Sequence, residues 1–231
     1  MSEAGADVQA MKRAVGLAAA QLVHQGMLVG LGTGSTAACF IDSLISRVRQ
    51  GLKITAVATS EKSAQRALQG GIHVIDINTV TTIDLTVDGA DEIDPEKRMI
   101  KGGGGALLRE KIIATSSSEM VVIVDETKCV KRLGNAKLPV EIVSFGYNTT
   151  IHRIEQLGYQ GGLRPANDGR PYVTDNGNYI YDIHCEQLLT SPETDHQRLI
   201  ALAGVVETGL FFQVAGRLIV GRTNGQVDVI P

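Results

Sequence analysis

The sequence contains no tryptophan, and only 4% of its 231 residues are aromatic. Proteins that hold single-stranded nucleic acid stack the bases on aromatic side chains, so this composition disfavours that class. The chain also lacks a large excess of either charge, because it has 22 Lys and Arg and 25 Asp and Glu, which gives a net charge of -3. Such a chain has no basic footprint for nucleic acid or an anionic membrane surface. We therefore expect neither a nucleic-acid partner nor a membrane partner.

Long apolar runs and paired cysteines are missing as well. No run approaches the roughly 20 apolar residues of a membrane span, and the N-terminus lacks the basic and apolar segments of a secretory signal. Three cysteines, Cys39, Cys129 and Cys185, are scattered without a C-x-x-C pair. We expect them to be reduced and buried rather than joined in disulfides. These features predict a cytoplasmic protein.

Strand and helix patterns alternate through the first 130 residues. Apolar residues at helical spacing and short apolar runs predict helices at 8–23, 40–48, 63–68 and 107–114, and strands at 27–31, 54–58, 72–75, 83–87 and 121–124. Ser35 or Thr36 is the expected N-cap of the second helix. This order predicts an α/β fold, a Rossmann-like, mostly parallel sheet with helices on both faces. Ligands of such sheets bind beyond the carboxyl ends of the strands.

The alternation of strand and helix patterns ends after residue 130. A helix at 149–157 ending at Gly158, a hairpin of 171–174 with 178–183, and a helix starting at Ser191 and Pro192 predict a small α+β insertion. Apolar runs at 218–220 and 227–230 predict strands that rejoin the main sheet. The predicted division is a catalytic domain of residues 1–130 with 205–231, and a small domain of residues 131–204.

The first chemistry-bearing segment is Gly30-Leu-Gly-Thr-Gly-Ser-Thr36, between a strand and a helix. Free N–H groups at a helix N-terminus, with the hydroxyls of Thr33, Ser35 and Thr36, favour a phosphate-binding loop. The loop lacks the lysine of a Walker motif, and Ser35 occupies the place of the third glycine in a dinucleotide motif. A tight turn with a serine cap is the alternative. We predict a phosphorylated small molecule as ligand.

The second segment is Asp88-Gly-Ala-Asp91, directly after a predicted strand. Two aspartates three positions apart on a turn can face one pocket, where each shifts the pKa of the other. Asx turns are the structural alternative, and we expect Glu92 and Asp94 to form a solvated acidic loop of that kind. A metal site is a further alternative. Magnesium would be its candidate ion, since no histidine is near in sequence.

The third segment begins with Lys101 and four consecutive glycines and leads to Glu110. A lysine beside exposed backbone amides suits the stabilisation of an oxyanion. Glu110, near the start of a helix, is a candidate base for a carbon-bound proton. Alone, it would read as a surface residue that pairs with Arg109 or Lys111. Next to Lys101 and the glycines, we interpret it as part of an active site.

Two further lysines are weaker candidates. Lys128 follows the predicted strand 121–124, and Lys12 lies on the first helix. Either side chain could reach a phosphate, although solvated lysines are the default. The five histidines show no ligand spacing and receive no role.

These segments together resemble the A-type ribose-5-phosphate isomerase family, from the first helix to the last strands. The resemblance rests on Thr33-Gly-Ser-Thr36, Asp88-Gly-Ala-Asp91, Lys101-Gly-Gly-Gly104, Arg109-Glu110-Lys111 and Val-Asp-Glu-Thr-Lys128. It implies interconversion of ribose 5-phosphate and ribulose 5-phosphate in the pentose phosphate pathway, without a metal or cofactor. It also implies a homodimer or homotetramer, with the small domain contributing to assembly.

The resemblance further implies a role for each matching residue. Glu110 would move the proton between C1 and C2, and Asp88 would assist ring opening. Lys101 would hold the enediolate oxygen with the amides of the following glycines. The remaining substrate-binding residues would be Thr33, Gly34, Ser35, Thr36, Gly89, Ala90, Asp91, Gly102, Gly103, Gly104 and Lys128.

Two other classes compete with this interpretation. The first is an enzyme of related fold, such as an amino-sugar phosphate isomerase/deaminase or an acyl-CoA transferase. A deaminase should carry a histidine near its acid–base residues, and a transferase glutamate would form an acyl-enzyme that hydroxylamine traps. The second is a sugar-phosphate sensor that controls transcription. Such a sensor needs a DNA-binding segment, which this chain is too short and too acidic to contain.

Overall fold

The computed structural model describes residues 3–185 and 189–231. The chain divides into two compact units. The first unit comprises Met1–Ala90, Arg109–Cys129 and Val214–Pro231, and the second comprises Asp91–Leu108 and Val130–Gln213. The segment Asp91–Leu108 thus groups with the later part of the chain. The division into a catalytic and a small domain stays a prediction, and residues 186–188 of that small domain lie outside the described part.

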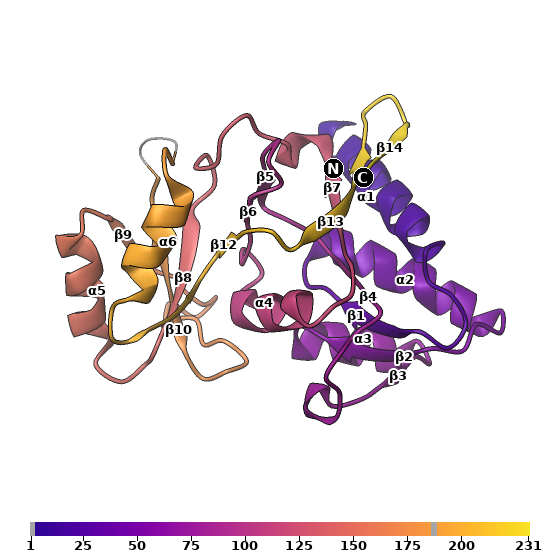
Figure 1. The fold of residues 1–231 in the computed structure, drawn as a ribbon, viewed down its shortest axis with the longest axis horizontal. Coiled ribbons are helices and arrows are strands. Elements are labelled where there is room, and N and C mark those ends of the chain that lie inside the picture. Colours follow the sequence, from indigo (N-terminus) through magenta and orange to yellow (C-terminus); the bar gives the residue numbers. More distant parts are fainter. Residues whose placement is uncertain (1–2, 186–188) are drawn as a thin grey trace. The chain divides into compact units, whose positions relative to one another are not determined.

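A seven-stranded sheet forms the centre of the first unit (Figure 1). Its strand order is β14-β13-β7-β4-β1-β2-β3. The strands are β1 (Leu28–Leu31), β2 (Thr55–Ala58), β3 (His73–Val74), β4 (Leu85–Asp88), β7 (Met120–Asp125), β13 (Ala215–Gly221) and β14 (Val227–Ile230). All neighbours pair in parallel except β13 with β14. The predicted parallel sheet and the return of the C-terminal strands to it are confirmed.

Helices cover both faces of this sheet, as predicted. They are α1 (Glu3–Ala20), α2 (Ser35–Arg49), α3 (Glu61–Gln69) and α4 (Leu107–Thr115). Val29 and Leu31 point to one face and belong to a buried cluster with Phe40 of α2. On the other face, a side chain at Gly30 would clash with Thr86 and with Ile113 of α4. Alternate residues of a strand point to opposite faces, so the β1 sequence leaves α4 room to pack closely.

The second unit holds two small sheets. The larger has the order β11-β8-β10-β9 and is antiparallel, with β8 (Leu138–Ile142), β9 (Gly161–Leu163), β10 (Tyr179–Ile183) and β11 (Val205–Thr208). The smaller has the order β12-β6-β5, with β5 (Glu92–Ile93), β6 (Met99–Ile100) and β12 (Leu210–Phe211). Two helices, α5 (Tyr147–Gln156) and α6 (Pro192–Ile200), complete it. The α+β composition predicted for this part of the chain is present.

The helix boundaries of the second unit follow their sequence signals. Gly158 has a φ of 96° just after the C-cap of α5, and Ser191 is the N-cap of α6 with Pro192 in its first turn. The predicted strand at 171–174 is wrong, because Pro171 and Val173 make only isolated bridges. Proline cannot donate to a strand ladder, which weakens pairing there. Strand β8 was not predicted, since Pro139 interrupts its apolar pattern.

The cysteines and the helices bear on two further expectations. All three cysteines are free thiols, as predicted, and Cys39 is buried. Cys129 is exposed, so the expectation that all three are buried is wrong. Cys129 lies after β7, at the end of a short 3-10 helix on the surface, where no other element among the described residues covers it. Among the described residues, every helix is too short or too polar to cross a membrane.

Candidate active site

The loop between β1 and α2 leads directly into the N-terminus of α2. The N-cap is Gly34, with a φ of 110°, and Ser35 is the first helical residue. The expected cap at Ser35 or Thr36 is therefore wrong, because the turn needs a backbone conformation that favours glycine. Among the described residues no side chain caps α2. The Ser35 hydroxyl instead accepts a hydrogen bond from Lys12 Nζ at 3.0 Å.

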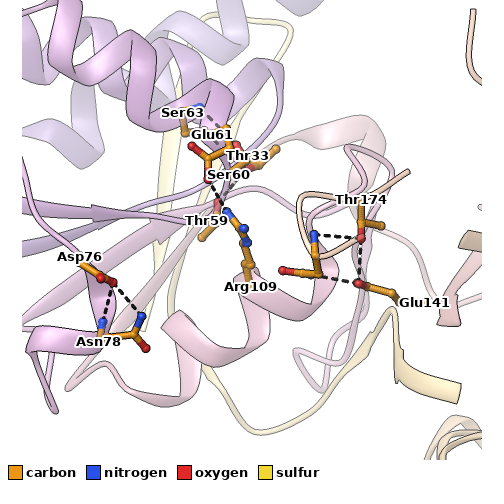
Figure 2. A network of polar contacts seen from close by, with 11 residues as sticks. Thr33, Thr59, Ser60, Glu61, Ser63, Asp76, Asn78, Arg109, Glu141 and Thr174 are labelled. Carbon is orange, nitrogen blue, oxygen red and sulfur yellow. Dashed lines mark hydrogen bonds and ion pairs between the residues drawn. The ribbon is translucent and has the colours of Figure 1, made fainter. Parts of the chain in front are cut away.

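A cluster of hydroxyl groups lies beneath this loop (Figure 2). Thr33 Oγ1 lies 2.6 Å from Thr59 Oγ1 and donates to Ser60 Oγ at 2.8 Å. Ser63 Oγ donates to the Gly32 carbonyl at 2.7 Å. These contacts tie the loop after β1 to the loop after β2. Thr33 is thus a structural anchor of the loop.

Asp88, the last residue of β4, is buried and holds the same loop from the other side. Its Oδ1 accepts hydrogen bonds from the Thr33 N–H at 3.0 Å and the Gly89 N–H at 2.7 Å. A side chain at Gly32 would collide with the Asp88 carboxylate, and one at Gly89 would lie 3.9 Å from Thr36 Cβ. The structure therefore brings the first two predicted segments together. Asp91 belongs to the second unit.

Glu110 occupies the first turn of α4 and is only 5% exposed. Its neighbour Arg109 pairs with Glu61 at 2.9 Å (Figure 2). The simple reading of Glu110 as a solvated surface residue is therefore excluded. A carboxylate largely removed from water interacts more strongly with nearby charges than a solvated carboxylate does.

The carboxyl end of β7 carries the last predicted group of the first unit. Asp125 is buried and is the N-cap of the short 3-10 helix Glu126–Lys128, where it accepts hydrogen bonds from the N–H and hydroxyl of Thr127. Lys128 ends that helix. Strands β1, β4 and β7 are parallel neighbours in the sheet, so these groups and the Thr33–Thr36 loop lie at one edge.

In the second unit, Lys101 is only 2% exposed and follows β6. Its N–H donates to the Gly209 carbonyl at 2.8 Å. Its Nζ lies 5.5 Å from the ring centroid of Phe211, a cation–π distance. A buried ammonium group beside an aromatic face acts in a low dielectric, where its attraction for an oxyanion is stronger than in water.

The glycines after Lys101 form a turn whose shape depends on their missing side chains. Gly102 has a φ of 107°, and its carbonyl accepts a hydrogen bond from the Gly105 N–H at 2.9 Å. The Gly103 N–H donates to Asp91 Oδ2 at 2.7 Å. A side chain at Gly103 would clash with that carboxylate. Asp91 and the glycine loop, predicted as separate segments, are thus in direct contact.

Glu92 and Asp94 do not form the solvated acidic loop that we expected. Glu92 is 3% exposed and accepts hydrogen bonds from the N–H groups of Gly134 and Ala136 at 2.7 and 2.5 Å. Asp94 is 4% exposed and pairs with Arg98 at 2.7 Å. A buried carboxylate needs such donors to offset lost hydration. Those of Glu92 come from residues distant in the chain, whereas Arg98 lies only four residues after Asp94.

Sequence reasoning missed the hydroxyls of Thr59, Ser60 and Ser63. A usable signal existed, because Thr59 and Ser60 directly follow β2 at the same sheet edge as the other motifs. Metal ligation gains no support from the fold. Within residues 3–185 and 189–231, no three His, Cys, Asp or Glu side chains are grouped to hold an ion.

Comparison with known proteins agrees with this geometry. The family model for ribose 5-phosphate isomerase A (phosphoriboisomerase A) matches residues 55–225. A protein of Protochlamydia amoebophila named ribose-5-phosphate isomerase A is 50% identical over 219 residues, covering 95% of this chain and 94% of that protein.

Two solved structures extend the similarity to three dimensions. Ribose 5-phosphate isomerase A from Methanocaldococcus jannaschii is 35% identical with a TM-score of 0.89, covering 95% of this chain and 97% of the other. A D-ribose-5-phosphate isomerase in complex with phospho-erythronic acid is 34% identical with a TM-score of 0.91, covering 96% and 98%. By family model, sequence and structure, this chain belongs to the ribose 5-phosphate isomerase A family.

Proposed function

We propose that this chain interconverts D-ribose 5-phosphate and D-ribulose 5-phosphate through a cis-enediolate, as an enzyme of the non-oxidative pentose phosphate pathway. The observation that carries the proposal is the buried carboxylate of Glu110, in the first turn of a helix that directly follows the lysine and glycine loop. Aldose–ketose isomerisation needs a base for a carbon-bound proton and a cationic partner for the oxygen beside it.

Glu110 is assigned as the base that takes the C2 proton of the aldose and returns it to C1. The proton is acidic only because the neighbouring carbonyl can accept the resulting charge as an enediolate. Abstraction leaves Glu110 protonated and the oxygen at C1 negative. Transfer of the hydroxyl proton from the oxygen at C2 to the oxygen at C1, together with return of the carbon-bound proton to C1, gives the ketose and restores the carboxylate. The reaction therefore balances without a cofactor.

Lys101 is assigned to the developing charge on the enediolate oxygen. Its ammonium group is buried, and the glycine loop that follows presents amides without side chains above them. The backbone groups of Gly102, Gly103 and Gly104 complete this loop, in which the Gly103 N–H already serves Asp91. Fixed donors of this kind need no reorganisation during the reaction.

The phosphate is assigned to the N-terminus of α2. This helix has 15 residues, starts after Gly34 without a side-chain cap among the described residues, and is flanked by the exposed Ser35. Its N–H groups and dipole favour an anion. Lys12 already reaches Ser35 and adds positive charge, and we assign Lys128 to the same phosphate.

Asp88 is assigned to ring opening and hydroxyl proton transfer, and Asp91 to the sugar hydroxyls. Two backbone N–H donors orient the Asp88 carboxylate at the end of β4, next to the loop that is assigned to the phosphate. Phospho-erythronic acid, bound by the related solved enzyme, carries a carboxylate with the planar pair of oxygens that an enediolate also has. The enediolate formed from a sugar phosphate in this chain would present a comparable pair of oxygens.

Assembly and location complete the proposal. We assign the chain to the cytoplasm and to a homodimer or homotetramer, with a catalytic domain of residues 1–130 and 205–231 and an assembly domain of residues 131–204. Phe145 is 91% exposed and Val143 38%, and such apolar side chains at a surface suit an interface between copies. Light scattering after size exclusion, on wild type and Phe145→Asp, tests the assembly.

The direct experiment is to mix the purified protein with ribose 5-phosphate and measure ketose formation. Ribose without phosphate is the matched control. Running the reaction in heavy water and following deuterium at C2 tests the enediolate route. Absence of ketose, with the protein folded, would overturn the proposal, and a covalent acyl-enzyme trapped by hydroxylamine would support a transferase instead.

A further inference from the structure

Arg164 is a charged side chain of the second unit that the roles above leave unused, and it contacts the glycine loop. Its Nη1 donates to the Gly102 carbonyl at 2.9 Å and to the Gly103 carbonyl at 3.2 Å. One guanidinium group thus holds two successive carbonyls of the loop that follows Lys101.

The guanidinium group is itself held in place by Asp182 of β10. Arg164 Nε donates to Asp182 Oδ2 at 2.9 Å and Nη2 to Oδ1 at 2.6 Å, a bidentate pair. Both side chains are largely buried, at 15% and 12% exposure. This fork geometry fixes the plane of the guanidinium as well as its position, which a lysine could not do.

The backbone of Arg164 is fixed too. Its N–H donates to the Ile180 carbonyl at 2.9 Å, and its carbonyl accepts from the Tyr172 N–H at 2.8 Å. The Tyr172 ring centroid lies 6.0 Å from the guanidinium carbon, and a side chain at Gly105 would collide with the Tyr172 hydroxyl. Arg164 and Tyr172 therefore support opposite ends of the same loop.

These contacts determine which way the loop amides point. A peptide unit is planar and trans, so its C=O and its N–H point in opposite directions. With the Gly102 carbonyl on Arg164, the Gly103 N–H points away from the guanidinium, and it is bound by Asp91. With the Gly103 carbonyl on Arg164, the Gly104 N–H also points away from the guanidinium.

We propose that Arg164, held by Asp182, is a positioning residue for the isomerisation: it orients the amides of Gly103 and Gly104 and so the loop that starts at Lys101. It acts through this loop and not on the substrate. The inference rests on the proposed function, because that function assigns Lys101 and the loop amides not already bound by Asp91 to the enediolate.

The test compares Arg164→Ala with Arg217→Ala. Arg217 makes an equally bidentate pair with Glu119, at 2.5 and 2.7 Å, near the start of β13 and away from the strand carboxyl ends. We expect Arg164→Ala to lower kcat about a hundred-fold, as small misplacements of catalytic groups do. KM should stay within about three-fold, because a contact made only in the transition state changes kcat alone. Arg217→Ala should keep the wild-type kcat.

Two further readouts separate positioning from simple stability. Added guanidinium should restore part of the Arg164→Ala rate, and Asp182→Asn should lower kcat less than Arg164→Ala does. Arg164→Lys, which lacks the fork, should recover little activity. If Arg164→Ala fails to fold, Asp182→Asn and Arg164→Lys carry the test. A folded Arg164→Ala with kcat within three-fold of wild type, or a loss confined to KM, would overturn the inference.

Hydrogen exchange without substrate distinguishes this inference from the proposed function. We expect the amides of the Lys101–Leu107 peptide to exchange faster in Arg164→Ala than in wild type and in Arg217→Ala. Equal exchange would overturn the role of Arg164, whatever the enzyme does. Failure of wild type to convert ribose 5-phosphate, together with faster exchange in the variant, would overturn only the function.

Discussion

The two units position the residues of the proposed site by different means. In the first unit, Asp88 ends a strand, and Ser35 and Glu110 lie in the first turns of helices. The regular backbone hydrogen bonding of these strands and helices positions the residues, and side-chain contacts with neighbouring residues adjust their orientation. In the second unit, Lys101 leads into a glycine turn without regular structure. There, side chains such as Arg164 set the shape of the loop.

Because their residues are positioned by different means, the two units should differ in how well they tolerate amino-acid substitutions. Groups at strand and helix ends stay in place as long as the sheet folds, because the burial of its apolar faces is a cooperative property of the unit. A glycine loop has many accessible conformations and loses more entropy on ordering than other sequences. It needs distant charged groups to select one conformation, so single substitutions far from the chemistry can disturb it.

The largest expected effect comes from Glu110→Gln, which tests chemistry in the first unit without altering its frame. The amide keeps the size of the side chain and removes its basicity, so ketose formation should fall about a hundred- to ten-thousand-fold. Thermal unfolding should be nearly unchanged, and substrate should still protect the protein. Deuterium exchange at C2 should fall in parallel. A folded variant within a few-fold of wild type would make Asp88 the next candidate base.

Lys101→Ala is the corresponding test of the second unit. Loss of one oxyanion donor should raise the barrier by about 3 kcal/mol, a rate loss of roughly a hundred-fold. Lys101→Met is the better-matched variant, because it keeps apolar volume beside Phe211 and removes only the charge. Turnover in both, with circular dichroism as the control for folding, decides the role. Unchanged turnover in a folded Lys101→Met would transfer oxyanion binding to the amides alone.

Removing the hydroxyls of Ser35 and Thr36 together should have a smaller effect, chiefly on binding. Hydrogen bonds to a charged ligand contribute about 1.5–3 kcal/mol each, so KM for ribose 5-phosphate should rise about ten-fold or more. Turnover should fall less, because phosphate contacts exist in ground and transition states alike. Equal protection of wild type and double variant by inorganic phosphate in thermal unfolding would contradict the phosphate assignment.

The Arg217–Glu119 pair offers a small, pH-dependent effect on the stability of the first unit. The hydrogen bonds from Arg217 lower the pKa of Glu119 below its ordinary value of 4.5. A lowered carboxyl pKa stabilises the folded state above the ordinary pKa, and this contribution is lost as the pH falls through the folded value. The free energy of unfolding of wild type should therefore exceed that of Arg217→Met by about 0.2–1 kcal/mol at neutral pH. The difference in Tm should shrink below about pH 4.5.

No effect is expected from exhaustive chelation. We assign the stabilisation of the enediolate to a lysine and backbone amides rather than to a metal, so the rate in EDTA should equal the untreated rate. A loss that added magnesium restores would contradict this and make Asp88, Asp91 and Asp94 candidate ligands.

Sequence patterns identified most of the first unit correctly. Short apolar runs and helical spacings predicted its strands and helices, and glycine with hydroxyl residues after β1 indicated a loop at a helix N-terminus. The cap itself was assigned wrongly to Ser35 or Thr36, because a positive φ at Gly34 depends on the turn that the sheet imposes. The hydroxyls of Thr59 and Ser60 were missed, since their contact with Thr33 crosses two strands.

By itself, the sequence determined the α/β class, the order of the motifs and the residue types available for acid–base chemistry, because these depend on local periodicity and on composition. Only the tertiary structure decided that Glu92 and Asp94 are buried and paired, and that Asp91 and Arg164 hold the glycine loop. These contacts join residues up to 62 positions apart. A glycine run has no intrinsic conformation of its own, and its shape follows from whichever side chains the fold brings against it.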